Sequence, residues 1–179
     1  MFPGQGSQTV GMGKELYDQF DEIKQLYQLA NDILEKDIQS LMFEGPQDIL
    51  TETENAQPAL LLASTAVYTL LEKENIHPSM VVGHSLGEYS ALVAAGSLKL
   101  EDALPLVQTR GRLMEDAYPK GQGTMAAILG MEEDAITEEL GKLDNEIVDI
   151  ANLNCPGQIV ISGSQAGVEE ASERLKEAG

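Results

Sequence analysis

The segment Gly83–Gly87, which reads GHSLG, constrains the fold of this chain more than any other stretch. It fits the pattern G-x-S-x-G. The apolar residues in PSMVV before it predict a short buried strand, and LGEYSALVAA after it predicts a helix that ends at Gly96. A strand, a sharp turn and a helix in this order form a nucleophile elbow, in which the serine hydroxyl projects at the helix N-terminus.

Ser85 is therefore interpreted as a nucleophile. Gly83 and Gly87 remove side chains that would clash across so sharp a turn. Unpaired N–H groups at the start of the following helix can stabilise an oxyanion. The alternative reading of the same pattern is a serine that only caps the helix.

In the first 121 residues, the pattern of apolar side chains predicts mainly helices. The opening MFPGQGSQTVGMG is typical of a loop, and residues 43–55 look irregular, with a turn at EGPQ. Helical periodicity predicts helices over 14–37, 57–76 and 99–119. The second of these is apolar on most sides over its first part, which predicts burial. We expect Pro58 and Pro105 to lie in the first turns of their helices, where a missing N–H matters least.

Residues 122–179 show a different pattern. They predict a strand at 125–130, a helix at 133–143, strands at 146–152 and 158–163, and a helix at 165–179. The order β-α-β-β-α is one strand short of a ferredoxin-like unit. We therefore expect two domains, 1–121 and 122–179, with the last strand of the second domain missing.

Charge and composition exclude several classes of protein. The chain has 11 basic and 30 acidic residues and a net charge of −19, which would repel nucleic acid. Its one cysteine, Cys155, excludes an internal disulfide and a cysteine-rich metal site, and we expect an inert thiol. No secretory signal and no apolar run of the ~20 residues that a membrane span needs are present. We expect a soluble, cytoplasmic protein without a metal.

Five segments together resemble one family. FPGQGSQ, GHSLGEYSALVAAG, TRGRLM, GTMAAILG and NCPGQIVISG are similar, in this order, to motifs of the malonyl-CoA:acyl-carrier-protein transacylases of fatty-acid synthesis, over essentially the whole chain. The resemblance implies an α/β fold: an α/β-hydrolase-like catalytic subdomain at 1–121, with a ferredoxin-like small subdomain at 122–179 inserted after it. It implies transfer of a malonyl group from coenzyme A to serine, then to the phosphopantetheine thiol of acyl carrier protein, with no cofactor.

The resemblance also assigns site residues. Ser85 matches the nucleophile, and the backbone N–H groups of Gln5 and Leu86 match the oxyanion hole. Arg110 matches the arginine that holds the malonyl carboxylate, a task that suits a planar guanidinium. On spacing alone Arg110 would be an ordinary surface cation. Arg112 lies on a different helix face and is the weaker candidate.

The glycines of FPGQGSQ could in isolation indicate a phosphate-binding loop. However, the segment lacks the Lys-Ser/Thr pair of a P-loop. We therefore do not assign a nucleotide to it.

The chain offers no obvious base for the serine. It has two histidines. His84 is interpreted as packing beneath the turn, on the side opposite Ser85. His77 precedes Pro78 at the far end of the expected strand. The resemblance places the family's catalytic histidine beyond Gly179 and a short apolar strand before Phe2, so we expect a chain truncated at both ends, with unpaired sheet edges and exposed apolar surface.

Three functions remain open. The leading hypothesis is an acyltransferase that takes malonyl-CoA and acyl carrier protein as substrates. The alternatives are a serine thioesterase or esterase that uses the same elbow, and a catalytically incomplete fragment that only binds. The sequence leaves open whether malonyl or methylmalonyl is preferred, and where the carrier protein docks on so acidic a chain.

Overall fold

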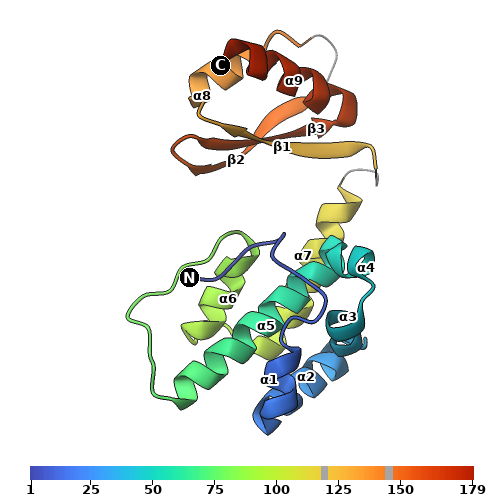
Figure 1. Cartoon of the computed structure of the whole chain (residues 1–179), viewed down its shortest axis with the longest axis vertical. Helices are drawn as coiled ribbons and strands as arrows, with labels where there is room; N and C mark the ends of the chain where they lie inside the picture. Colours follow the sequence, from blue (N-terminus) through green and yellow to red (C-terminus); the bar gives the residue numbers. More distant parts are fainter. Residues whose placement is uncertain (118–120, 144–146) are drawn as a thin grey trace. The chain divides into compact units, whose positions relative to one another are not determined.

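The computed structural model describes residues 1–117, 121–143 and 147–179, and every statement below concerns these residues. The chain combines helices with a small antiparallel sheet, which confirms the expected mixture of α and β structure. It divides into two compact units, Met1–Glu115 and Asp116–Gly179 (Figure 1). Each unit has its own hydrophobic core.

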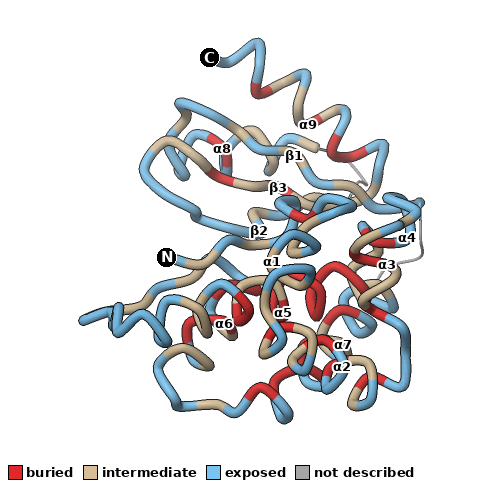
Figure 2. The backbone as a smooth tube through the Cα atoms, turned by 60° about the horizontal axis from the view of Figure 1, so that its bottom comes forward, coloured by how far each residue is buried: buried red, intermediate tan, exposed pale blue. Residues whose placement is uncertain are grey.

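The first unit is built around one long helix whose N-terminal part is buried. Its elements are α1 (Lys14–Gln19), α2 (Asp21–Leu34), α3 (Ile38–Glu44), α4 (Gln47–Thr51), α5 (Thr53–Lys73), α6 (Leu86–Ala94) and most of α7 (Leu100–Asp116). The core gathers apolar side chains of α2, α3, α5 and α7, and of Leu50 and Leu86. Figure 2 shows buried residues concentrated where α5 meets its neighbours, which confirms the burial predicted from its apolar surface.

Two proline predictions were wrong. The helix α5 begins at Thr53 and α7 at Leu100, so Pro58 and Pro105 are each the sixth residue of a helix rather than part of its first turn. A proline at this position cannot donate to the carbonyl four residues before it. The buried faces of both helices compensate for the lost bonds. Residues 43–55, expected to be irregular, are mostly helical: they contain the end of α3, all of α4 and the start of α5, joined by short connections.

The buried strand predicted before the elbow is not present. Met80 is 88% exposed and Val82 60% exposed, and the extended chain forms a single parallel bridge, between Phe2 and Gly83. Two hydrogen bonds hold this bridge: Phe2 N donates to Val82 O (2.8 Å), and His84 N donates to Phe2 O (3.2 Å). A strand needs partners along its length, and among the described residues only the segment at Phe2 pairs with this one.

The second unit confirms the predicted order β-α-β-β-α. Its elements are β1 (Gly123–Leu129), α8 (Glu133–Leu140), β2 (Val148–Cys155), β3 (Gln158–Ser164) and α9 (Gln165–Ala178). The sheet has the order β1-β3-β2, with both pairs antiparallel. Both helices cover one face of the sheet (Figure 1), where Ile159 and Ile161 of β3 pack against Ile136, Val168 and Leu175. Glu146, the first residue of the strand predicted at 146–152, lies outside the described residues. Tyr118 and Pro119, at the end of the helix predicted at 99–119, lie outside them as well.

The cap of α3 gives a test of the first unit. Asp37 accepts a hydrogen bond from the backbone N–H of Ser40 (3.0 Å), and this bond, with a smaller contribution from Asn31, holds the pKa of the Asp37 carboxyl below its usual value of 3.8. A carboxyl with a lowered pKa stabilises the folded chain when the pH is above the usual pKa of the group. This stabilisation is lost as the pH falls through the lowered pKa.

We therefore expect Asp37→Ala to lower the free energy of unfolding by about 1 kcal/mol near neutral pH. The difference from the wild type should shrink in acid, as denaturant titrations over a range of pH would show. Asp37→Asn keeps an acceptor and serves as the control. An equal difference at neutral and acidic pH would mean that the ionised cap is not the cause.

Candidate active site

Ser85 lies at a strained turn between an extended segment and α6. Its φ is 52° and its ψ −107°, a conformation that residues with a side chain rarely adopt. The neighbouring glycines permit the turn. A Cβ at Gly83 would lie 1.9 Å from the carbonyl of Gly87, and a Cβ at Gly87 would lie 2.4 Å from Phe2 O. The backbone therefore crosses itself at distances that no other residue type allows.

The side chain of Ser85 does not cap the helix that it precedes. It makes no capping hydrogen bond to α6 and is exposed. Its Oγ instead accepts a hydrogen bond from Nη2 of Arg110, at 3.1 Å. The hydroxyl thus points toward a cation that lies 25 residues further along the chain.

Arg110 is held on three sides. Its Nη1 donates to Oε1 of Gln57 (2.7 Å), its Nη2 donates to Ser85, and its Cζ lies 5.6 Å from the ring centroid of Tyr89. A guanidinium over an aromatic face is attracted by the electron density of the ring. Arg110 is half-buried, whereas Arg112 is exposed. The geometry does not fit the interpretation of Arg110 as an ordinary surface cation.

Close packing of α7 on the start of α5 brings Arg110 to this place. A Cβ at Gly111 would lie 2.5 Å from Thr53 O, so the two backbones touch. One helical turn after Gly111, Oε1 of Glu115 accepts a hydrogen bond from Thr53 N (2.8 Å). The same threonine accepts a hydrogen bond from Nε2 of Gln5 (3.1 Å), which ties the N-terminal loop to this junction.

The two candidate oxyanion donors lie on segments that run past the elbow. Leu86 is the first residue of α6, and a helix provides no acceptor for its first N–H groups. The next two N–H groups are used, since Gly87 N donates to His84 O and Glu88 N donates to Ser85 O. Gln5 follows the segment Phe2–Gly4, whose backbone lies against Gly83, His84 and Gly87.

The prediction for His84 was wrong. Its side chain is exposed rather than packed beneath the turn, and a Cβ at Gly4 would lie 2.7 Å from its Nδ1. The alternation of a flat strand, on which the prediction rested, does not hold where Ser85 has a positive φ. His77 is also exposed, in the segment that leads to the elbow.

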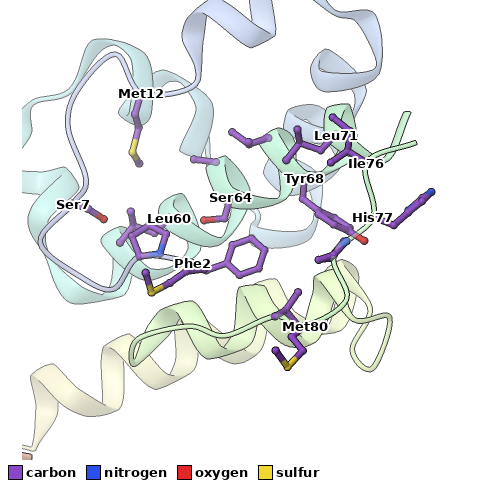
Figure 3. A pocket seen from close by; sticks show the side chains of 16 residues that line it. Phe2, Ser7, Met12, Leu60, Ser64, Tyr68, Leu71, Ile76, His77 and Met80 are labelled. Carbon is purple, nitrogen blue, oxygen red and sulfur yellow. The ribbon is translucent and has the colours of Figure 1, made fainter. Parts of the chain in front are cut away.

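His77 lines an apolar groove of about 490 Å³ that Ser85 does not line. Figure 3 shows Phe2, Leu60 and Tyr68 around its middle and His77 at one end. Met80 and Ile76, both largely exposed, also line it. The groove is a surface of the first unit rather than part of the serine site.

The described residues contain neither a cluster of metal ligands nor a membrane-spanning helix. In that part of the chain, no group of three or more His, Cys, Asp or Glu side chains could hold a metal ion. Cys155 is exposed at the end of β2. No helix within the described ranges has both the length and the apolar character that crossing a membrane requires.

Sequence reasoning missed Gln57 and Tyr89. Gln57 carries a usable signal, because it is a polar residue at the start of an apolar run, QPALLLA, in a helix predicted to be buried. Its side chain is completely buried. Tyr89 carries no comparable signal, since a tyrosine on a half-buried helix usually only packs.

Comparison with known families decides the classification. The model of the acyl transferase domain matches residues 1–179. The chain belongs to this family. It is 54% identical to the malonyl CoA-acyl carrier protein transacylase of Bacillus subtilis and 46% identical to that of Staphylococcus aureus strain MRSA252, with all of this chain covered in both. It spans 57% and 58% of the length of these two relatives.

Solved structures of acyl transferases have the same fold over the matched region. An acyl carrier protein S-malonyltransferase of Vibrio cholerae O1 is 44% identical with a TM-score of 0.89, covering 99% of this chain and 59% of its own. A malonyl-transacylase solved in complex with a type II polyketide acyl-carrier protein is 42% identical with a TM-score of 0.91, covering 99% of this chain and 58% of its own.

The elbow gives the prediction for this site. Because a Cβ at Gly83 would overlap the backbone of Gly87, we expect Gly83→Ala to lower the free energy of unfolding by at least ~1–3 kcal/mol, the usual range for overpacking. Chemical denaturation followed by circular dichroism measures the change. Gly141→Ala is the matched control: Gly141 has an ordinary φ of −66°, and its Cβ would meet nothing nearer than 3.4 Å. Equal stability of the two variants would contradict the tight turn.

Proposed function

We propose that this chain carries the acyl-transfer site of a malonyl-CoA:acyl-carrier-protein transacylase of fatty-acid biosynthesis. The observation that supports this best is the hydrogen bond from Arg110 to Oγ of Ser85. A malonyl group esterified to this oxygen has its carboxylate beyond one carbonyl and one methylene carbon, within reach of the same guanidinium. A cation beside the acylated atom favours acyl groups that end in a negative charge.

The proposed reaction has two transfer steps. Oγ of Ser85 attacks the thioester carbonyl of malonyl-CoA, the C–S bond breaks, and coenzyme A leaves as the thiol. The thiol of phosphopantetheine on acyl carrier protein then attacks the serine ester, the C–O bond to Oγ breaks, and Oγ recovers a proton. A base must take the hydroxyl proton in the first step and pass it to the leaving sulfur of coenzyme A; in the second step it takes the proton of the phosphopantetheine thiol and passes it to Oγ. The resemblance assigns this base to a histidine in the part of the relatives that the chain does not span.

We propose that the N–H groups of Gln5 and Leu86 stabilise the tetrahedral intermediates of both steps. The position of Leu86 supports this assignment, because its N–H lies at the start of α6, directly after Ser85. The position of Gln5 supports it because hydrogen bonds hold the N-terminal loop to the elbow at Phe2 and to α5 at Thr53. Loss of one such donor typically costs ~2.7–4 kcal/mol of transition-state stabilisation.

The subdomain assignment is part of the proposal. We propose that residues 1–121 form part of an α/β-hydrolase-like catalytic subdomain and that residues 122–179 form a ferredoxin-like subdomain without its last strand. The sheet order β1-β3-β2 with both helices on one face supports the second assignment. We also propose that the enzyme acts in the cytoplasm and uses no metal or organic cofactor.

Arg110 favours transfer over hydrolysis. A serine thioesterase or esterase could use the same elbow, but it has no need of a guanidinium at hydrogen-bond distance from its nucleophile. The relatives named above are transacylases, and one of them has been solved with an acyl-carrier protein. Malonyl-CoA and acyl carrier protein are therefore the substrates that we propose.

Intact-mass spectrometry of the chain after incubation with malonyl-CoA tests the proposal. We expect a gain of one malonyl group that disappears in Ser85→Ala. In Arg110→Ala we expect labelling to slow by on the order of tenfold to a hundredfold, because hydrogen bonds to a charged group are lost. Arg112→Ala is the matched control, since Arg112 is exposed on the same helix, and it should label like the wild type. Labelling that persists in Ser85→Ala, or labelling of Arg110→Ala at the wild-type rate, would contradict the proposal.

A further inference from the structure

Gln57 is a completely buried polar side chain near the start of α5. Ala56 and Pro58 beside it are buried as well. A buried amide must find hydrogen-bond partners, because leaving it unpaired costs free energy. Both of its partners come from α7: Oε1 accepts from Nη1 of Arg110 (2.7 Å), and Nε2 donates to Sδ of Met114 (3.3 Å).

The chemistry of these partners dictates which way the amide faces. A guanidinium can only donate hydrogen bonds, and a thioether sulfur can only accept them. Arg110 and Met114 are four residues apart and therefore share one face of α7. The amide of Gln57 can thus satisfy both only with its oxygen toward Arg110, the arrangement observed. Its acceptor is therefore fixed in place before any substrate binds.

The acceptor is also neutral, and this matters for a site that must bind an anion. A carboxylate at the same place would fix the guanidinium equally well, but it would cancel the positive charge that a substrate carboxylate needs. An amide oxygen holds Nη1 and leaves the charge of Arg110 intact. With Nη1 bound to Gln57, Nη2 lies 3.1 Å from Oγ of Ser85, and the face of the guanidinium lies toward the ring of Tyr89.

We propose that Gln57 is a positioning residue that orients Arg110 beside Ser85 and thereby sets the preference of the site for acyl groups that end in a carboxylate. The inference rests on the proposed function of Arg110. Gln57 is completely buried and hydrogen-bonds to Arg110 and Met114, so it acts through the guanidinium. Its effect is therefore specific to charged acyl groups, which use Arg110, and does not extend to uncharged ones.

Acylation of Ser85 by two thioesters tests the inference. We compare labelling rates with malonyl-CoA and with acetyl-CoA, which lacks the carboxylate, by intact-mass spectrometry. Gln57→Leu removes the acceptor, and Gln57→Glu keeps its shape but adds a competing charge. In both variants we expect malonyl labelling to fall by roughly tenfold to a hundredfold, the usual effect of losing a hydrogen bond to a charged group. Acetyl labelling should stay at the wild-type rate.

Thr65→Val is the matched control for damage to α5. Thr65 is buried on the same helix, and its Oγ1 donates to Leu61 O. We expect this variant to keep the wild-type ratio of malonyl to acetyl labelling. An equal loss with both thioesters in the Gln57 variants would indicate a merely structural role and would overturn the inference. An unchanged ratio in these variants would overturn it too, while leaving the proposed function intact.

A second readout does not depend on acylation. The chain has three arginines, Arg110, Arg112 and Arg174, so NMR of arginine-labelled protein can follow each guanidinium. We expect resolved Nη signals for Arg110 in the wild type and averaged signals in Gln57→Leu, where rotation is no longer hindered. Arg112, which is exposed, gives averaged signals in both. If Ser85→Ala labels as fast as the wild type, the proposed function fails, and equal Arg110 signals in the wild type and Gln57→Leu would overturn the positioning role.

Discussion

The hydrogen bonds that Arg110 donates join three segments that are far apart in the sequence. Nη1 reaches Gln57 on α5, and Nη2 reaches Ser85 at the elbow before α6. These bonds depend on the contact between Gly111 and the backbone at Thr53, which lets α7 approach α5 more closely than any residue with a side chain would allow. The candidate site is therefore a product of helix packing as much as of the elbow itself.

The elbow depends on a second close approach of backbones. A residue in the conformation of Ser85 stores strain of order 1–3 kcal/mol, which persists only where the surroundings determine it. Here the surroundings are the buried Leu86 and Gly87 at the start of α6 and the bridge from Phe2. The strain holds Oγ at the surface, 3.1 Å from Nη2 of Arg110.

Much of the fold could be predicted because it follows from local patterns. The order β-α-β-β-α of the second unit, the burial of the N-terminal part of α5 and the helix α6 after the elbow follow from periodicity and glycine placement, and the structure has all three. The predictions of secondary structure fail where contacts between residues far apart in the sequence determine the conformation. The segment before the elbow is an exposed extended chain because, among the residues that the structure describes, it pairs only at Phe2. Pro58 and Pro105 lie inside helices because the buried faces of those helices outweigh one lost hydrogen bond each.

The sequence by itself determined the turn around Ser85, since the two glycines and the flanking strand-like and helical patterns leave few conformations for a serine between them. Through its motifs it also indicated the candidate site residues Ser85, Arg110, Gln5 and Leu86. Only the tertiary structure decided that Arg110 bonds to Ser85, and that Gln57 and Tyr89 hold it there. The physical reason is that these contacts span α5, α6 and α7, and their geometry depends on how closely the helices pack, which no local pattern specifies.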